Sequence, residues 1–291
     1  MRYRQADARR TEILRAAART GYVASAELAA MLGVSEMTVR RDIEKLAAEG
    51  ALERVLGGAW LTEAARPAFG VREAQASDAK RAIARLTASL LCAGTMGLRP
   101  GTMGLRPGTI GLDAGTTVAL VAPALPAHSW VVTHSVPVIE AVEQRDDLDL
   151  IVAGGVYQRT TRSFVGPAVL HALEGLALDV AVISVAAIDD GWLLGGDSLD
   201  AAVKRALIAA ARRVLVVADA SKIGARAPIR LARLDAVDDI VTDPAGAAAL
   251  GDGGGAVGGA VGGGGPAVHI ADLTPAGSPV DVGSIPAAAI P

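Results

Sequence analysis

The sequence has little cysteine and few aromatic residues. Cys92 is the single cysteine among 291 residues, which excludes an internal disulfide and a cysteine-based metal cluster. Its apolar neighbours predict a buried small side chain rather than a reactive thiol. Phe, Trp and Tyr together make up 3% of the chain, so a surface of interleaved aromatics that stacks on nucleic-acid bases is not expected.

Long hydrophobic runs are missing as well. No uninterrupted apolar run approaches the roughly 20 residues that cross a bilayer, and residues 1–7 lead into no apolar signal core. We therefore expect a cytoplasmic protein that does not contact a membrane. Hydrophobic residues still make up 51% of the sequence, which is enough to bury a core, and a chain of this length suits two domains better than one.

Basic residues are concentrated near the beginning of the chain, although the formal net charge is −3. This uneven distribution is typical of a nucleic-acid-binding domain in an otherwise acidic protein. The basic side chains in question are Arg2, Arg4, Arg9, Arg10, Arg15, Arg19, Arg40, Arg41, Lys45 and Arg54.

The first sixty residues carry the start and stop signals of three short helices and a hairpin. We predict helices from Asp7 to Gly21, from Ser25 to Gly33, and from a Ser35 cap to about Gly50, followed by a hairpin over residues 52–61 that turns at Gly57 and Gly58. Gly33 supplies a tight turn between the second and third helices. Two helices joined in this way form a helix-turn-helix, and the hairpin adds the wing.

The third helix has one apolar and one polar face. At about 100° per residue, Val39, Ile43 and Leu46 point one way, whereas Met37 and Arg41 point nearly opposite. A guanidinium suits guanine edges or phosphate, and hydroxyls near a helix start suit phosphate oxygens. The predicted DNA contacts are Ser35, Met37, Thr38, Arg40, Arg41, Lys45 and Arg54. The alternative is a solvated face on which these arginines pair with Asp42, Glu44 and Glu49.

The second half of the chain alternates short apolar strands with turns and helices. A helix is predicted near residues 78–91, and strands at 110–112, 130–133, 148–152, 180–185, 214–217 and 240–241. This alternation predicts a mostly parallel sheet covered by helices on both faces, that is, an α/β domain.

Two segments depart from that pattern. Residues 95–101 recur unchanged at 102–108, and we interpret the repeat as a duplication that lengthens a loop. Beyond about residue 245 the chain consists mainly of Gly, Ala and Pro and has too few large apolar side chains to order itself. The expected domains are therefore a winged helix-turn-helix at 1–62, a linker at 63–77, an α/β domain at 78–244 and a disordered tail at 245–291.

Residues 113–117 have the composition of an anion-binding loop. They follow a short apolar strand, and Gly115 allows close backbone approach while Thr116 and Thr117 offer hydroxyls. Such a loop alone is a weak signal and is more often a simple helix cap. Ligands of parallel sheets bind at the carboxyl ends of the strands, where Lys204 or Lys222 could neutralise a phosphate.

Several motifs make the resemblance specific. Residues 27–29, 32–35, 38–43 and 57–59 resemble the N-terminal signature of the DeoR family of sugar-metabolism regulators, with Leu56 in place of the usual His. Residues 113–117, 131–133, 163–166, 203–206 and 218–222 resemble its effector domain, whose fold is similar to that of ribose-5-phosphate isomerase. His134 stands there where Asn is usual. The effector contacts that this resemblance implies are Asp113, Gly115, Thr116, Thr117, Thr133, Gly154, Gly155, Ser163, Gly166, Asp197, Lys204, Asp219 and Lys222.

The resemblance implies a transcription regulator that represses a carbohydrate-catabolism operon. Its partners would be double-stranded operator DNA, a phosphorylated sugar effector and further copies of the chain in a dimer or tetramer, with no cofactor, no metal and no enzymatic activity. One alternative is a sugar-phosphate isomerase with a DNA-binding domain, for which Asp200 or Asp189 would be the general base. Another is an adaptor whose basic helix no longer binds DNA.

Overall fold

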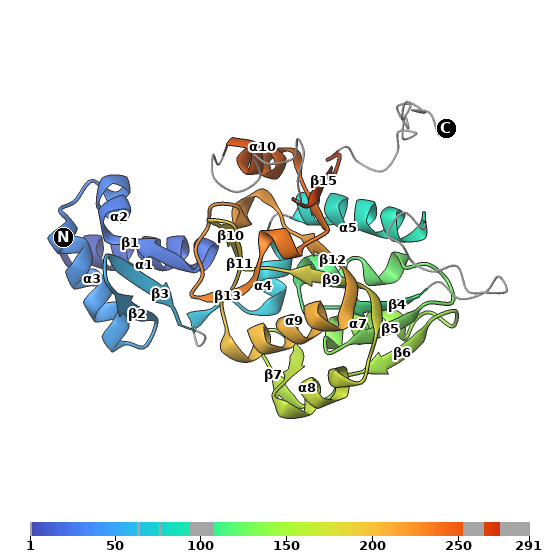
Figure 1. Ribbon diagram of the computed structural model, residues 1–291. Helices are drawn as coiled ribbons and strands as arrows, with labels where there is room; N and C mark the ends of the chain where they lie inside the picture. The colour runs from blue at the N-terminus through green and yellow to red at the C-terminus, as the bar shows by residue number, and fades with distance from the viewer. Residues whose placement is uncertain (1, 63–64, 76, 94–107, 253–264, 274–291) are drawn as a thin grey trace.

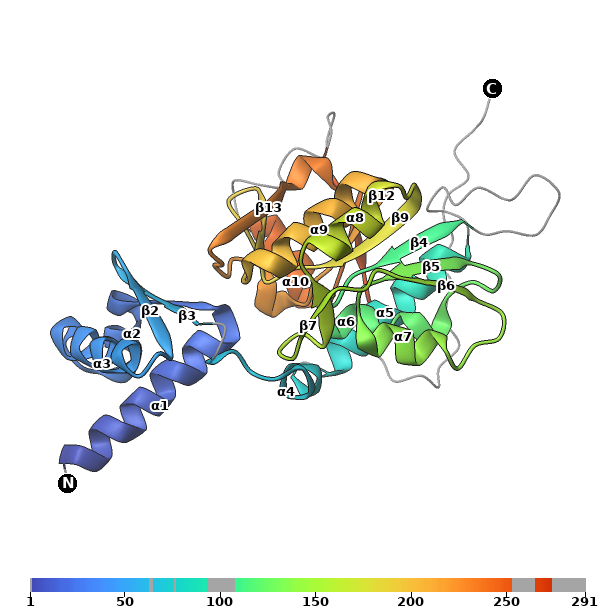
Figure 2. The same ribbon diagram turned by 90° about the horizontal axis from the view of Figure 1, so that it is seen from below.

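The computed structural model describes residues 2–62, 65–75, 77–93, 108–252 and 265–273, arranged as a small N-terminal domain beside a larger α/β domain (Figures 1 and 2). The repeated segment 95–107 lies outside the described residues, as do 253–264 and 274–291 of the predicted tail. No helix in the described ranges is both long and apolar enough to span a membrane.

The N-terminal domain is a winged helix-turn-helix. Its elements are α1 (Arg2–Thr20), β1 (Tyr22–Ala24), α2 (Ser25–Leu32), α3 (Glu36–Ala48), β2 (Leu52–Val55) and β3 (Gly58–Leu61). The predicted helices and hairpin are confirmed. The short strand β1 was not predicted, and it pairs antiparallel with β3 to give the sheet order β1-β3-β2.

The turn between α2 and α3 has the local chemistry that the sequence indicated. Gly33 ends α2 in the left-handed conformation with φ 63°, which costs glycine little. The Ser35 side chain accepts a hydrogen bond from the Thr38 N–H and so caps α3. Val39, Ile43 and Leu46 are buried in one cluster with α1 and the wing, and this packing leaves the opposite face of α3 exposed.

The segment expected to be an irregular linker contains a helix, α4 (Phe69–Ala74), which precedes α5 (Ser77–Cys92). Phe69 is buried in the core of the larger domain, so this part of the segment is anchored there. A helix of six residues has too little periodicity to be detected in the sequence. The prediction that Cys92 is buried was wrong, because it lies in the last turn of α5, one residue beyond buried Leu91, and is exposed.

A seven-stranded parallel sheet forms the centre of the larger domain. Its order is β15-β14-β12-β9-β4-β5-β6, and every neighbouring pair is parallel. The strands are β4 (Thr109–Leu112), β5 (Trp130–Thr133), β6 (Asp149–Val152), β9 (Leu178–Ser184), β12 (Ala211–Val217), β14 (Asp239–Thr242) and β15 (Ala267–Ile270). The six predicted strands are confirmed.

Alternate residues of the central strands face two separate hydrophobic cores. Val180 and Val182 pack with α5, α6 (Thr116–Ala119) and α7 (Val136–Val142), whereas Ala181 and Ile183 pack with α8 (Pro167–Glu174) and α9 (Ser198–Ala210). The two-residue period of a strand thus places one helical layer on each face. This arrangement leaves the ends of the strands as the accessible edge.

Small antiparallel sheets and short helices complete the domain. The sheets are β7 (Val156–Gln158) with β8 (Ser163–Val165), and β10 (Ala187–Asp189) with β11 (Trp192–Gly195) and β13 (Ile229–Arg233). The 3-10 helices are Ala122–Ala124, Ala220–Lys222 and Leu234–Ala236. These strands were not predicted from the sequence.

The beginning of the predicted disordered tail is ordered. Residues 244–252 form α10 (Pro244–Asp252), and β15 adds to the edge of the sheet beside β14. His269 contacts the buried carboxylate of Asp239 at 2.8 Å, and Ala271 is buried. The expectation of disorder was therefore wrong for residues 245–252 and 267–270, because four residues that pair with a sheet edge can be ordered despite a weak composition.

Candidate functional site

The outer face of α3 presents the predicted DNA contacts to solvent. Met37 is 58% exposed, and Arg40, Arg41 and Lys45 are exposed, as are Ser35 before the helix and Arg54 on the wing. Thr38 is half-buried, and its hydroxyl lies 2.9 Å from that of Ser35. The sequence therefore brings these polar side chains to one accessible helix and its wing.

The alternative of a fully paired face fits only part of this surface. Arg40 pairs with Glu36 at 2.5 Å and Arg54 with Glu44 at 3.2 Å, both exposed, where such pairs contribute little. Asp42 is buried and contacts Arg9 of α1 at 2.5 Å. Within the described part of the chain, Arg41 makes no ion pair. Arg41 is thus presented to solvent with its charge available for a nucleic-acid partner.

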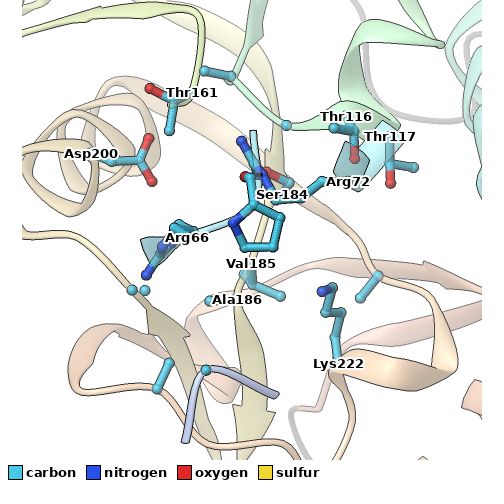
Figure 3. Close-up of a pocket in the computed structure, with 18 of the residues that line it drawn as sticks. Arg66, Arg72, Thr116, Thr117, Thr161, Ser184, Val185, Ala186, Asp200 and Lys222 are labelled. Carbon is cyan, nitrogen blue, oxygen red and sulfur yellow. Dashed lines mark hydrogen bonds between the residues drawn. The ribbon is translucent and has the colours of Figure 1, made fainter. Parts of the chain in front are cut away.

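A cavity opens at the carboxyl ends of β4, β9 and β12 (Figure 3). Gly115, Thr116 and Thr117 line it after β4, Ser184 at the end of β9, and Asp219 after β12. A Cβ atom on Gly115 would lie 2.1 Å from the Ser184 hydroxyl. Glycine is therefore required at that position for the two strand ends to meet.

Positive side chains gather around this cavity. Arg66, Arg72, Lys80 and Lys222 all line it. Burial is the largest cause that lowers the pKa of Lys80, to about 8; Asp219 opposes the shift, and the charges of Lys222 and Arg72 add to it. Burial also lowers the pKa of Lys222, with Arg72 and Arg66 contributing. Cations that disfavour one another's charge in this way are stabilised by a bound anion.

An ionic cluster lies beneath the floor of the cavity. The fully buried Asp113 carboxylate accepts hydrogen bonds from the Ser184 N–H at 3.0 Å and hydroxyl at 2.6 Å, and it forms an ion pair with Lys204 of α9. Burial would raise the pKa of Asp113, but Lys204 and His134 outweigh it and hold this pKa well below its usual range. Asp113 is therefore a structural counter-ion.

Asp200 is the second carboxylate of this cluster, and it reaches the cavity. Its Oδ2 lies 3.5 Å from the Lys204 ammonium, whereas its buried Oδ1 has no hydrogen-bond partner among the described residues. Burial raises the pKa of Asp200, and the attraction of Lys204 opposes that shift. An unsatisfied buried carboxylate oxygen is a strong acceptor for a ligand hydroxyl.

The structure brings together only some of the predicted effector contacts. Gly115, Thr116, Thr117, Lys204, Asp219 and Lys222 line the cavity. Asp113 lies beneath it. The remaining residues do not line it: Thr133 donates to the Leu112 carbonyl, Ser163 contacts Thr161, Asp197 caps α9, Gly166 precedes α8 with φ 97°, and Gly154 and Gly155 are exposed before β7.

Sequence reasoning missed Arg66, Arg72 and Lys80 because they lie in or just after the presumed linker. One signal was available for Lys80. It is buried on the same stripe of α5 as Ile83 and Thr87, at the spacing of an apolar helix face. A lysine at such a position requires a partner or a function. Thr161, which also lines the cavity, comes from a loop and carried no such signal.

Two family models match the chain: the DeoR-like helix-turn-helix domain over residues 9–65 and the DeoR C terminal sensor domain over residues 75–244. The chain is 33% identical to the HTH-type transcriptional repressor CsqR of Escherichia coli over 246 residues, which cover 83% of this chain and 89% of that one. It is 31% identical to the glycerol-3-phosphate regulon repressor of Escherichia coli, with 77% and 85% covered.

Among solved structures, ribose 5-phosphate isomerase A from Methanocaldococcus jannaschii aligns with 16% identity over 50% of this chain and 54% of that one, with a TM-score of 0.35. That alignment is too partial to bear on activity. The two family models and the full-length repressor relatives lead to one conclusion. The chain belongs to the DeoR family of transcriptional regulators.

Proposed function

We propose that this protein represses a carbohydrate-catabolism operon and that a phosphorylated sugar controls its binding to operator DNA. The observation that carries the proposal is the cavity at the strand ends, which is lined by Arg66, Arg72, Lys80 and Lys222. The hydroxyls of Thr116 and Thr117 add donors for phosphate oxygens. The glycerol-3-phosphate regulon repressor, a relative by sequence, is named for a phosphorylated three-carbon compound.

Other groups in the lining suit the hydroxyl groups of a sugar. The free Oδ1 of Asp200 is an acceptor, and Thr161, whose hydroxyl contacts Ser163 at 2.7 Å, is a donor or acceptor. Asp200 and Thr161 line the cavity and take the place of Asp197, a predicted effector contact that does not line it. A ligand that carries both a phosphate and hydroxyl groups matches this mixed lining.

The DNA contacts come from α3 and the wing. Arg41 and Lys45 are exposed on α3, and a helix-turn-helix places the corresponding face of its second helix in the major groove. Operators of such proteins consist of paired half-sites, which requires at least a dimer. We propose that the protein acts in the cytoplasm as a homo-oligomer, with a DNA-binding domain that ends near residue 62 and a sensor domain that extends from α4 to β15.

We propose binding without turnover at this site. Asp200 is the carboxylate that a sugar-phosphate isomerase reaction could use as a base, since it lines the cavity and its pKa is raised. Asp189, the other candidate, does not line the cavity. The neighbouring ammonium of Lys204 holds the Asp200 carboxylate in place. This favours a role for Asp200 as an acceptor of hydrogen bonds from the ligand.

Calorimetric titration tests the proposal. Ribose 5-phosphate, glucose 6-phosphate and glycerol 3-phosphate are compared with their unphosphorylated counterparts. At least one phosphorylated compound is expected to bind, and Lys222→Ala is expected to weaken that binding at least tenfold. Lys45→Ala, a matched lysine substitution on α3, should leave it unchanged.

Three results would contradict the proposal. If no phosphorylated sugar binds, or if Lys222→Ala binds as the wild type does, the anion site is wrongly placed. Detection of an isomerised product by NMR after incubation with ribose 5-phosphate would show that the site is catalytic.

A further inference from the structure

The wall of the cavity includes the junction between the two domains. Arg66 and Pro67, which follow the wing, line it together with Leu61 at the end of β3. Ala18 and Gly21 of the N-terminal domain line it as well. Residues 65–68, which we call the junction segment, thus connect the DNA-binding domain to the edge of the cavity.

Arg66 is seated closely against the sensor domain. A Cβ atom built on Gly196, in the loop between β11 and α9, would lie 1.9 Å from a guanidinium nitrogen of Arg66. The guanidinium therefore rests on the Gly196 backbone in space that any side chain would fill. In Figure 3, Arg66 and Asp200 lie on one side of the opening, and Lys222, Thr116 and Thr117 on the other.

Arg72 belongs to α4 and bonds to both the junction segment and the sensor domain. Its Nε donates to the Pro67 carbonyl at 3.2 Å, and a terminal nitrogen donates to the Thr160 carbonyl at 2.8 Å. Buried Phe69 anchors the same helix. The sensor domain thus begins structurally at α4, and Arg66 is the cavity cation that belongs to the connection with the DNA-binding domain.

We propose that Arg66 couples occupancy of the cavity to the position of the DNA-binding domain. Arg66 and Lys222 line the same cavity from opposite sides (Figure 3), and the charge of Arg66 disfavours that of Lys222. In the empty cavity the two cations repel each other, and an anion between them attracts both. Occupancy thereby holds the junction segment against the sensor domain.

The two domains also contact each other outside the cavity. The Arg226 guanidinium lies 5.6 Å from the centre of the Tyr22 ring, and the Arg226 carbonyl faces Gly21. Movement of the junction segment changes these contacts together with the orientation of α3. Because linkage is reciprocal, DNA that prefers one orientation must also change the affinity for the anion. The inference rests on the proposed function and assigns to Arg66 the coupling between anion binding and DNA binding.

Hydrogen exchange of the full chain, read by mass spectrometry with and without saturating inorganic phosphate, tests this assignment. In the wild type, phosphate is expected to slow exchange both at residues 113–119 of the cavity and at the junction segment. In Arg66→Gln and Gly196→Ala, it should slow exchange at 113–119 and not at the junction segment. Gly196→Ala displaces Arg66 without altering any charge, so the two variants separate position from charge.

Matched controls and a second measurement complete the test. Arg85→Gln, on the exposed face of α5, and Gly175→Ala, where a Cβ meets nothing within 4 Å, should behave as the wild type. By calorimetry, Arg66→Gln should weaken phosphate binding about tenfold, the loss expected for one charge-assisted contact.

The outcomes separate the two proposals. Phosphate protection at residues 113–119 alone in the wild type, or unchanged protection of the junction segment in both variants, would overturn the coupling role and leave the anion site standing. Protection at neither segment of the wild type would overturn both.

Discussion

Raising the pH from 7 to 9 should weaken binding of a phosphorylated ligand through Lys80. Its pKa is lowered to about 8, so the charged fraction falls from about 0.9 at pH 7 to about 0.1 at pH 9. A ligand that requires the ammonium then binds up to about tenfold more weakly at pH 9. An ordinary lysine, with a pKa of about 10.4, would stay charged over this range.

The direction of the pH dependence follows from the protonation state of Lys80 that the bound anion stabilises. A bound phosphate favours the ammonium and raises the pKa of Lys80, so binding takes up a proton near pH 8. Calorimetry of glycerol 3-phosphate in buffers of different ionisation enthalpy measures that uptake directly. The phosphate itself is mainly a dianion over this range, because its second pKa is about 6.

Lys80→Arg is the matched control, since it keeps the charge at all pH values tested. Its affinity should fall less between pH 7 and 9, and any slope that remains belongs to Lys222, whose pKa is also lowered by burial. Equal affinity of the wild type at pH 7 and pH 9, with no proton uptake, would refute the place given to Lys80 in the anion site.

Three further substitutions test other parts of the structure. Arg41→Ala should weaken operator binding by about 1–3 kcal/mol, as measured by fluorescence anisotropy, whereas Arg85→Ala, at an exposed position, should not. If Arg41→Ala changes neither the affinity nor its dependence on salt, the adaptor alternative is favoured. Leu46→Ala should lower the free energy of unfolding by about 2–5 kcal/mol in urea, and fully exposed Leu56→Ala should have no effect; equal stabilities would contradict the packing of α3. Lys204→Met removes the lysine partner of the buried Asp113 and Asp200 carboxylates and should cost about 3–5 kcal/mol at pH 7. The loss should be smaller at pH 5, and a loss independent of pH would disprove the ion pairs.

The sequence was most informative where local chemistry determines local structure. The turn and the start of α3 could be predicted from Gly33 and Ser35, because a left-handed backbone position and a helix cap each need a particular residue type. The parallel strands were predictable because those in the centre of the sheet are buried on both faces and consist of continuous apolar runs.

The composition of the cavity depends on contacts between distant residues and was less predictable. Asp113 has the same motif in the sequence whether it binds a ligand or a buried lysine, and its pairing with Lys204 spans 91 positions. Arg66 enters the cavity only because Gly196 leaves room for it. Neither contact leaves a pattern in the neighbouring sequence. Asp113 was therefore predicted to contact the effector, and Arg66 was not predicted to do so.

The most direct measurement compares DNA affinity with and without ligand. A duplex selected by the purified protein from random-sequence DNA is titrated by fluorescence anisotropy at fixed salt, in the presence and absence of saturating ribose 5-phosphate, glucose 6-phosphate or glycerol 3-phosphate. At least one compound should change the dissociation constant about fivefold or more, and Lys222→Ala should abolish the change. If the dissociation constant is the same with all three compounds and without them, the strand-end cavity does not control DNA binding.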